Sequence, residues 1–316
     1  MKNIKGKVAF ITGGASGIGL GIAKVFVKNE MKVIIVDMRQ DALDEAMAYF
    51  KKNGTDKSVH PINLDVTDRE AYKLAADEAE RVFGKIHILI NNAGVGSGGS
   101  VVTSTYKDWD YSMGVNVGGV INGIVTILPR ILKHGEEGHV VSTSSTVGLF
   151  AMIGCGIYTT TKFAVTGLME SLASELEGTN VGASVLYPGG TTTNLGLSSM
   201  VNRPEHLKNE GEPEFRPPPP QGQGGPRRMP MMMDTSVFMD PVEVGERVLR
   251  AIKRNDIFII THPEFRDGIK CRQDAVLRAI PDEPPNVRRA AVLRGFGTLV
   301  YNPIYERQTT PGPPDW

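Results

Sequence analysis

The stretch IYTTTKFAV, residues 157–165, places a tyrosine and a lysine four residues apart. The residues that follow have the apolar pattern of an amphipathic helix, so a helix that begins at or before Tyr158 would put Tyr158 and Lys162 on one face. A free tyrosine has a pKa of about 10 and is a poor base at neutral pH, whereas a nearby ammonium favours the phenolate. The spacing predicts an acid–base pair, with plain neighbours on a helix face as the alternative. The three threonines 159–161 are expected to point away from that face and receive no chemistry.

A glycine-rich loop, TGGASGIG, runs from Thr12 to Gly19 between an expected strand and an expected helix. Glycines let the backbone approach a pyrophosphate, and the amino end of a helix supplies free N–H groups. Asp37 lies 20 residues after Gly17, where a carboxylate would accept a hydrogen bond from a ribose 2′-hydroxyl and repel a 2′-phosphate. The loop therefore predicts NAD in preference to NADP, and the alternative is a tight structural turn. Arg39 is interpreted as a solvated loop charge.

These residues need a scaffold, and short β-branched segments alternate with longer amphipathic ones along the chain. Strands that are apolar throughout and alternate with helices are parallel and covered on both faces. The sequence therefore predicts an α/β fold, a doubly wound Rossmann-type parallel sheet of about seven strands, with ligands at the carboxyl ends of the strands. Strands are expected at 7–14, 32–37, 60–66, 87–94, 138–145, 182–190 and 256–262, and helices at 17–29, 41–54, 69–84, 104–133, 158–177 and 264–280. Thr67 and Glu70 are expected to form the capping box of the third helix.

A Pro-, Gly- and Met-rich insertion at about 195–240 interrupts this single domain, which is expected to span residues 1–262. No regular element is expected in its densest part, 212–234. A mobile lid over a substrate pocket, with Met231, Met232 and Met233 as adaptable apolar contacts, and a solvated insertion are both compatible with the composition. Residues 263–316 are expected to form a C-terminal helix and a Pro-rich tail, packed on the surface or on a neighbouring subunit.

The composition excludes several function classes. Lys and Arg number 35, as do Asp and Glu, so no net charge favours nucleic acid or an anionic membrane. The two cysteines, Cys155 and Cys271, are too few for a disulfide framework, and the six histidines lack metal-site spacing. No segment is read as a membrane span or a signal peptide. A cytoplasmic protein without a metal site is expected.

The motifs together closely resemble the short-chain dehydrogenase/reductase family over residues 1 to about 260. The glycine loop has the form TGxxxGxG, NNAG follows at 91–94, and Asn116 lies in VNVGG. Ser145 precedes Tyr158 by thirteen residues, Tyr158 and Lys162 match YxxxK, and PGGTTTN occupies 188–194. Each motif is common by itself, and their order along the chain makes the resemblance specific.

The resemblance implies a catalytic set of Asn116, Ser145, Tyr158 and Lys162. Tyr158 would be the acid–base, Lys162 would lower its pKa and hold the nicotinamide ribose, Ser145 would bind the substrate oxygen, and Asn116 would anchor a water. Ser144 is the rival for the serine role, and the thirteen-residue spacing selects Ser145. Besides Tyr158 and Lys162, the implied cofactor contacts are Gly13, Ser16, Gly17, Ile18, Gly19, Asp37, Asp65, Val66, Asn92, Ala93, Gly94, Pro188, Gly189, Thr191 and Thr193.

The implied function is an NAD-dependent oxidoreductase that interconverts a secondary alcohol and a ketone. Residues 105–132 also resemble bacterial Cα-dehydrogenases, which oxidise benzylic alcohols in lignin-type aryl ethers. The alternatives are a non-catalytic NAD(H)-binding regulator, an NADP-dependent carbonyl reductase, and an epimerase or dehydratase of the same family. The family's habit implies a homodimer or homotetramer acting on a small molecule.

Overall fold

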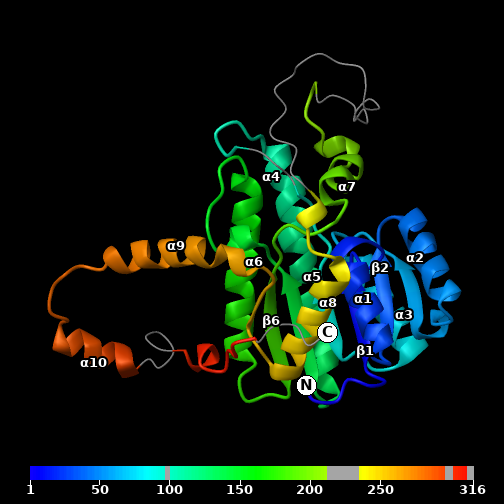
Figure 1. Ribbon diagram of the computed structural model, residues 1–316, viewed down its shortest axis with the longest axis horizontal. Helices are drawn as coiled ribbons and strands as arrows, with labels where there is room; N and C mark the ends of the chain where they lie inside the picture. Colours follow the sequence, from blue (N-terminus) through cyan, green and yellow to red (C-terminus); the bar gives the residue numbers. More distant parts are fainter. Residues whose placement is uncertain (97–99, 212–234, 296–301, 312–316) are drawn as a thin grey trace.

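A computed structural model of the chain describes residues 1–96, 100–211, 235–295 and 302–311. Over these ranges the chain builds a seven-stranded sheet with the order β3-β2-β1-β4-β5-β6-β7, in which every neighbouring pair is parallel (Figure 1). The order reverses between β1 and β4, the position where a doubly wound sheet opens a crevice for ligands. The strands are β1 (Val8–Thr12), β2 (Lys32–Asp37), β3 (Val59–Asn63), β4 (Ile88–Asn91), β5 (Gly138–Thr143), β6 (Val181–Tyr187) and β7 (Phe258–Ile260).

Helices cover both faces of the sheet and bury two separate apolar layers. One layer joins the sheet to α1 (Gly17–Lys28), α2 (Gln40–Lys52) and α8 (Pro241–Arg254). The other joins it to α3 (Arg69–Phe83), α5 (Gly119–Lys133) and α6 (Gly156–Glu175). The central strands have no polar face because both sides of the sheet are covered, so the predicted α/β fold with a parallel sheet of about seven strands is confirmed.

The long helix expected at 104–133 is divided into three parts. It begins with α4 (Tyr106–Met113), passes through a π-helical turn, η2 (Gly114–Gly118), and continues as α5. Thr105 and Asp108 form a capping box at its start. The capping box predicted from Thr67 and Glu70 is wrong, because Asp68 is the N-cap of α3 and accepts hydrogen bonds from the backbone of Glu70 and Ala71.

Several elements lie where the sequence predicted none. The insertion begins with a helix, α7 (Leu195–Val201), and ends before α8, which packs on α1. A further helix, α10 (Val287–Gly295), lies in the expected tail. Residues 212–234, including Met231, Met232 and Met233, lie outside the described residues, so the choice between lid and solvated insertion stays open for them. Short helical turns are η1 (Asp56–Ser58), η3 (Thr146–Gly148), η4 (Glu205–Leu207), η5 (Thr235–Val237), η6 (Pro263–Phe265) and η8 (Pro303–Tyr305).

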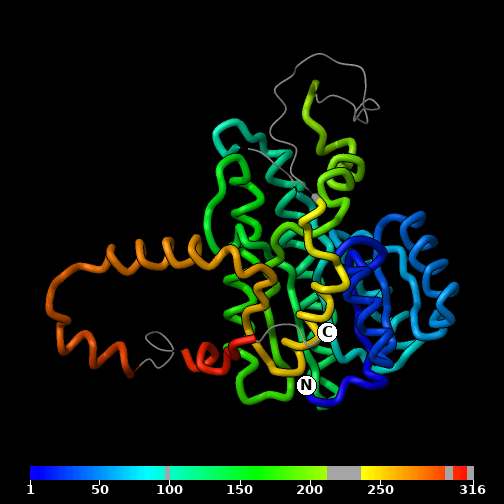
Figure 2. The backbone as a smooth tube through the Cα atoms, viewed as in Figure 1, coloured from blue at the N-terminus to red at the C-terminus, as the bar shows by residue number. Residues whose placement is uncertain are grey.

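The C-terminal part forms an arm and a return segment. Helices α9 (Arg266–Arg278) and α10 extend away from the sheet and bury none of their residues (Figure 2). Residues 302–309 then pack on the body of the same chain. Gln308 donates to and accepts from the backbone of Phe258, and Ile304 is buried. The return segment therefore covers the free edge of β7, which would otherwise offer unpaired backbone groups.

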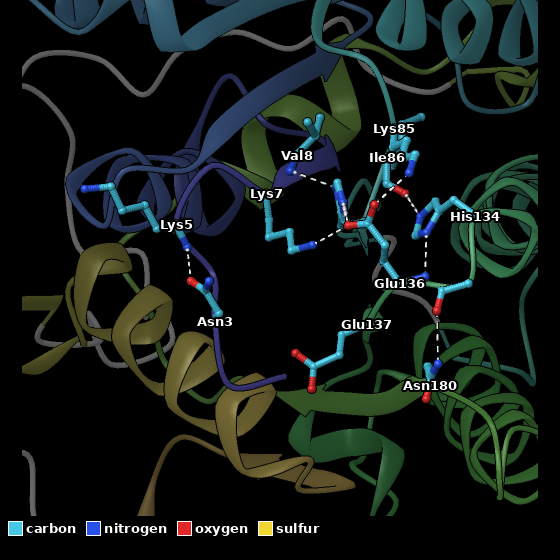
Figure 3. A network of polar contacts seen from close by, with 12 residues as sticks. Asn3, Lys5, Lys7, Val8, Lys85, Ile86, His134, Glu136, Glu137 and Asn180 are labelled. Atoms are coloured by element: carbon cyan, nitrogen blue, oxygen red, sulfur yellow. Dashed lines mark hydrogen bonds and ion pairs between the residues drawn. The ribbon is translucent and has the colours of Figure 1, made fainter.

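A charged network closes the opposite edge of the sheet, at the amino ends of the strands (Figure 3). Glu136 lies 2.6 Å from the ammonium of Lys7 and 2.7 Å from that of Lys85, and 3.1 Å from Nε2 of His87. These residues precede β5, β1 and β4, so the network ties together the beginnings of three neighbouring strands. Ligands of doubly wound sheets bind at the other edge, and this network is structural.

By length and composition alone, one helical stretch, Tyr106–Lys133, could cross a membrane. Its inner face packs on β4, β5 and α3, and it carries the buried amides of Asn116 and Asn122. We therefore assign it to the core of the domain, as a helix with one buried and one exposed apolar face.

Candidate active site

A cavity of about 450 Å³ opens at the carboxyl ends of β1, β2, β4 and β5. This volume lies in the range of small-molecule and cofactor sites. Every predicted site residue lines it except Gly19 and Asn116, which lie behind its wall. The predicted residues that line it are Gly13, Ser16, Gly17, Ile18, Asp37, Asp65, Val66, Asn92, Ala93, Gly94, Ser145, Tyr158, Lys162, Pro188, Gly189, Thr191 and Thr193.

Tyr158 and Lys162 lie on the cavity side of α6, one helical turn apart. The Lys162 ammonium is 5.4 Å from the centre of the Tyr158 ring and donates a 2.9 Å hydrogen bond to the carbonyl oxygen of Thr143. Burial raises the pKa of Tyr158 to about 12, and a hydrogen bond with Ser145 works against this rise. Burial also lowers the pKa of Lys162 to about 8. The lysine therefore stays protonated near neutral pH, and the phenol keeps its proton.

The pKa of Tyr158 is raised in this structure, so the predicted lowering by Lys162 stays a prediction. Loss of hydration is the largest effect on Tyr158, and Lys162 is not among the causes of its shift. The Lys162 ammonium is held by the end of β5 and lies over the Tyr158 ring, 5.4 Å from its centre. A phenolate at this position requires further positive charge or a hydrogen bond from a bound molecule.

The two neighbouring serines have different partners. Ser145 caps η3, lines the cavity and reaches the Tyr158 hydroxyl. The Ser144 hydroxyl donates a 2.8 Å bond to the carbonyl oxygen of Lys162 and lies 3.1 Å from the hydroxyl of Thr166. Ser144 thus attaches β5 to α6, whereas the Ser145 hydroxyl is placed to reach Tyr158.

Asn116 occupies the π-helical turn η2 and is fully buried. Its Oδ1 accepts a 2.7 Å hydrogen bond from the N–H of Val95. Its Nδ2 donates to the carbonyl oxygen of Val95 at 2.9 Å and to the hydroxyl of Thr161 at 3.1 Å. A Cβ added at Gly94 would lie 3.1 Å from Asn116 Oδ1 and 3.6 Å from Lys162 Nζ, so Asn116 holds the loop that separates it from the cavity. The three threonines 159–161 are absent from the cavity lining, and Thr161 instead supports Asn116. π-Helical turns occur frequently at functional sites.

The glycine loop leaves space only for backbone. A Cβ at Gly19 would lie 2.0 Å from the carbonyl oxygen of Gly13, an impossible contact, and Gly13 has a φ of +61°. Thr12 fixes the loop, since its hydroxyl accepts bonds of 3.0 and 3.1 Å from the N–H groups of Asn92 and Ala93. On the opposite wall, Thr193 contacts Gly17. The loop forms a cradle of bare backbone at the amino end of α1, which fits a pyrophosphate.

Asp37 and Arg39 lie together at the end of β2. The Arg39 backbone N–H donates a 3.1 Å bond to Asp37 Oδ1, and its guanidinium lies 3.9 Å from the same oxygen. Burial raises the pKa of Asp37, against the hydrogen bond and charge of Arg39. The interpretation of Arg39 as a solvated loop charge is wrong: it lines the cavity beside Asp37.

The first part of the insertion forms a wall of the cavity, which agrees with the lid interpretation, although the residues that line the cavity were not predicted individually. After β6 the chain passes over the site as α7 and η4, and it contributes Leu195, Ser198, Asn202, Pro204, His206 and Leu207 to the lining. Below this wall an isolated β-bridge joins the residues after β6 to those before α8: the N–H of Thr192 donates to the carbonyl oxygen of Met239, and the N–H of Met239 donates to that of Gly190. No role was predicted for His206, and no spacing in the sequence indicates that this segment folds back over the cavity.

Metal chemistry has no support within the described ranges, where no three His, Cys, Asp or Glu side chains gather as ligands would. Cys155 caps the start of α6 and is not among the cavity residues, and Cys271 is exposed on α9. Both are free thiols.

Comparison with known proteins gives consistent relatives. The family model for short chain dehydrogenases matches residues 7–202. A C alpha-dehydrogenase of Sphingobium sp. (strain NBRC 103272 / SYK-6) is 36% identical over 305 residues, which make up 94% of this chain and 95% of the relative. The similarity thus extends past the family model, through the insertion and into the C-terminal arm.

Two solved structures share the fold and most of the length. The apo form of LigO from Sphingobium sp. strain SYK-6 has a TM-score of 0.73 and 38% identity, and the match covers 99% of this chain and 100% of that one. A short chain dehydrogenase/reductase from Burkholderia phymatum, solved in complex with NAD, has a TM-score of 0.78 and 32% identity, with 91% and 100% covered.

Proposed function

Because this chain belongs to the short-chain dehydrogenase family and is an oxidoreductase that uses a nicotinamide cofactor, we propose that it interconverts a benzylic or other aryl secondary alcohol and its ketone with NAD. The observation that carries the proposal is the convergence of Ser145, Tyr158 and Lys162 on the cavity that the glycine loop opens. A non-catalytic sensor would not need these proton-transfer side chains beside a cofactor site.

The chain's own residues fit a dinucleotide. The bare backbone around Gly13 and Gly19 would hold the pyrophosphate, and Asp37 would accept a hydrogen bond from the adenosine ribose. Lys162 and Asn92 to Gly94 would hold the nicotinamide ribose, and Pro188 to Thr193 would line the carboxamide and phosphate side. Asp65 and Val66 would bound the adenine.

NAD is proposed over NADP because Asp37 is a partly buried carboxylate at the ribose position, where a 2′-phosphate would meet like charge. Arg39 partly compensates, since it lies beside Asp37. We expect Arg39 to reduce the preference for NAD over NADP without reversing it, because its backbone N–H and its guanidinium both lie beside the Asp37 carboxylate.

The reaction divides between a hydride and a proton. When bound, the oxidised nicotinamide supplies the hydride acceptor and a positive charge. In alcohol oxidation, Tyr158 takes the hydroxyl proton as the carbon–hydrogen bond gives up its hydride, and Ser145 holds the substrate oxygen. Lys162, with a pKa of about 8, remains cationic near neutral pH and stabilises the phenolate. Reduction of the ketone runs the same transfers in reverse.

The surroundings of Tyr158 support an apolar substrate. Exposed apolar side chains flank the amino end of α6: Met152 and Ile153 precede it, and Val101 touches the position of Gly156. Such clusters on a protein surface mark binding sites. Together with the full-length similarity to a C alpha-dehydrogenase, they favour an aryl alcohol over a small aliphatic one.

The test is a steady-state assay with wild type and Tyr158→Phe, using NAD and NADP and a panel of benzylic, steroidal and aliphatic secondary alcohols. We expect benzylic alcohols with NAD to give the highest kcat/KM, and Tyr158→Phe to lower kcat by about 10²- to 10⁴-fold while NADH still binds. Tyr49→Phe, on α2, is the control and should behave as wild type. Retained turnover in Tyr158→Phe would refute the assignment of the acid–base, and inactivity of wild type across the panel would favour the NAD(H)-binding regulator.

We further propose that the protein is a cytoplasmic homodimer or homotetramer. The outer face of α5 leaves Ile121, Val125 and Leu132 exposed, and the α9–α10 arm buries none of its residues. Isolated helices of such lengths are marginal in water, so a second copy of this chain is the proposed cover for both. In this proposal residues 1–262 are the catalytic domain and 263–316 an appendage that serves assembly.

A further inference from the structure

Several hydrogen bonds hold the segment that passes over the cavity against α4, and one ion pair joins them. The Arg203 guanidinium lies 2.8 Å from Asp108 Oδ1 at the start of α4, and both side chains are largely buried, with 11% and 18% exposed. Arg203 Nε also donates a 2.8 Å bond to the carbonyl oxygen of Leu207. A single side chain thus ties both sides of the turn 202–207 to α4.

Asp108 is fully engaged in this fastening. Its Oδ1 also accepts a 2.9 Å bond from Asn209, and its Oδ2 accepts a 2.8 Å bond from the backbone N–H of Thr105. Burial would raise the pKa of Asp108, but the bonds from Thr105, Arg203 and Asn209 prevail and lower it to about 2. The ion pair therefore persists at any pH at which the protein works.

The fastened turn lies over one particular end of the cavity. The Arg203 guanidinium stands 5.5 Å from the centre of the Tyr111 ring, and the Tyr111 hydroxyl donates a 2.9 Å bond to the carbonyl oxygen of Ser199 in α7. Tyr111 lines the cavity together with Asp65 and Val66. The helix that continues from it, α5, lies against the same end, since Asn122 donates a 2.8 Å bond to the carbonyl oxygen of Val66. Asp65 and Val66 bound the adenosine end of the proposed cofactor site.

We propose that Arg203 is a positioning residue: through Asp108 it holds Pro204, His206 and Leu207 as a wall over the adenosine end of the cavity and so retains the bound cofactor. The inference rests on the proposed use of the cavity as a dinucleotide site. A wall that is already in place before binding does not have to be ordered by the ligand, so affinity is gained by avoiding that entropic cost. Loosening the wall should weaken the hold on the cofactor and leave the chemical step at Tyr158 unchanged.

The test compares full-length wild type, Arg203→Ala and Arg203→Lys by NADH fluorescence titration and by hydrogen exchange of residues 202–208 without cofactor. We expect Arg203→Ala to raise the Kd for NADH and the KM for NAD about tenfold, which corresponds to about 1.4 kcal/mol. The KM for the alcohol should stay the same, kcat should not fall, and exchange in 202–208 should increase. Arg203→Lys keeps the charge opposite Asp108 but loses the arginine fork, so its values should lie between those of wild type and Arg203→Ala.

Arg130→Ala is the matched control, because Arg130 forms a comparable pair with Asp77 and Glu80 on the far side of α5. It should change neither the Kd for NADH nor exchange in 202–208. A wild-type Kd in Arg203→Ala despite increased exchange would overturn the inference, and so would a raised Kd without increased exchange. Failure of wild type to bind NADH would instead refute the proposed function and the inference with it. A thermal unfolding scan of each variant confirms that it is folded, and Arg203→Lys carries the test if Arg203→Ala is not.

Discussion

Burial changes the pKa values of Tyr158 and Lys162 in opposite directions. It raises the pKa of the phenol to about 12 and lowers that of the ammonium to about 8, because each environment disfavours the charged form. A bound positive charge would lower the phenol pKa from this starting point. We therefore expect proton transfer by Tyr158 to depend on a bound cofactor that carries positive charge.

A second buried group, His139 in β5, makes the stability of the fold depend on pH. Burial lowers its pKa from 6.5 to about 3, and its Nε2 lies 2.7 Å from the Ser184 hydroxyl. The unfolded chain therefore binds a proton below about pH 6.5 that the folded chain refuses, so the stability is complete above that pH and is lost as the pH falls towards 3.

We expect His139 alone to reduce the free energy of unfolding by about 2 kcal/mol between pH 6.5 and pH 5, at about 1.4 kcal/mol per pH unit. Urea unfolding of wild type and His139→Gln at neutral and mildly acidic pH measures this effect. The variant should be less stable at neutral pH and less sensitive to acid. Equal pH slopes for the two proteins would contradict the assignment, since His87, whose pKa is also lowered, is present in both.

At the scale of elements, helices α1 and α8 pack more closely than side chains allow. A Cβ at Gly21 would lie 2.1 Å from the carbonyl oxygen of Pro241, and one at Gly245 would lie 2.8 Å from the carbonyl oxygen of Gly21. The amino end of α1 is also the end that the glycine loop presents to the cavity. The glycine pair thus sets the position of α8, and with it that of Met239, which exchanges backbone hydrogen bonds with Gly190 and Thr192.

Gly21→Ala should destabilise the protein by about 1 to 3 kcal/mol, because the added methyl meets backbone atoms that cannot rotate away. Thermal or urea unfolding measures the loss. Gly268→Ala in α9 is the matched control, since its Cβ would find its nearest neighbour at 3.7 Å, an ordinary contact. That change should be neutral or slightly stabilising. An unchanged stability in Gly21→Ala would mean that α8 can move away from α1 without cost.

At the scale of the whole molecule, the exposed apolar face of α5 and the α9–α10 arm call for a partner surface. Val125 is 68% exposed in the middle of the α5 face. We expect light scattering after size exclusion to show a dimer or tetramer for wild type and a smaller species for Val125→Asp, because a buried unpaired carboxylate opposes association. Leu74→Asp on α3, where the leucine is 69% exposed, is the control and should keep the wild-type mass. A monomeric wild type would contradict the proposal that a second copy of the chain covers α5 and the α9–α10 arm.

The sequence by itself determined the order of strands and helices, the glycine loop and the residues around Tyr158. Local patterns determine these features: a buried parallel strand must be apolar throughout, and a loop that approaches phosphate must be glycine-rich. Helices α8 and α10 were not predicted from the sequence, because each lies beside a proline-rich segment that is typical of irregular structure. The cap of α3 was also assigned to Thr67, where Asp68 has the better geometry.

Only the tertiary structure decided how the groups of the cavity act on each other. Burial, which depends on every neighbouring element, raises the pKa values of Tyr158 and Asp37. The fold also places Arg39 beside Asp37 at the cavity. The wall over the cavity joins Arg203 to Asp108, residues 95 positions apart in the sequence. No periodicity relates such distant residues, because their meeting depends on how the chain after β6 folds back over α4.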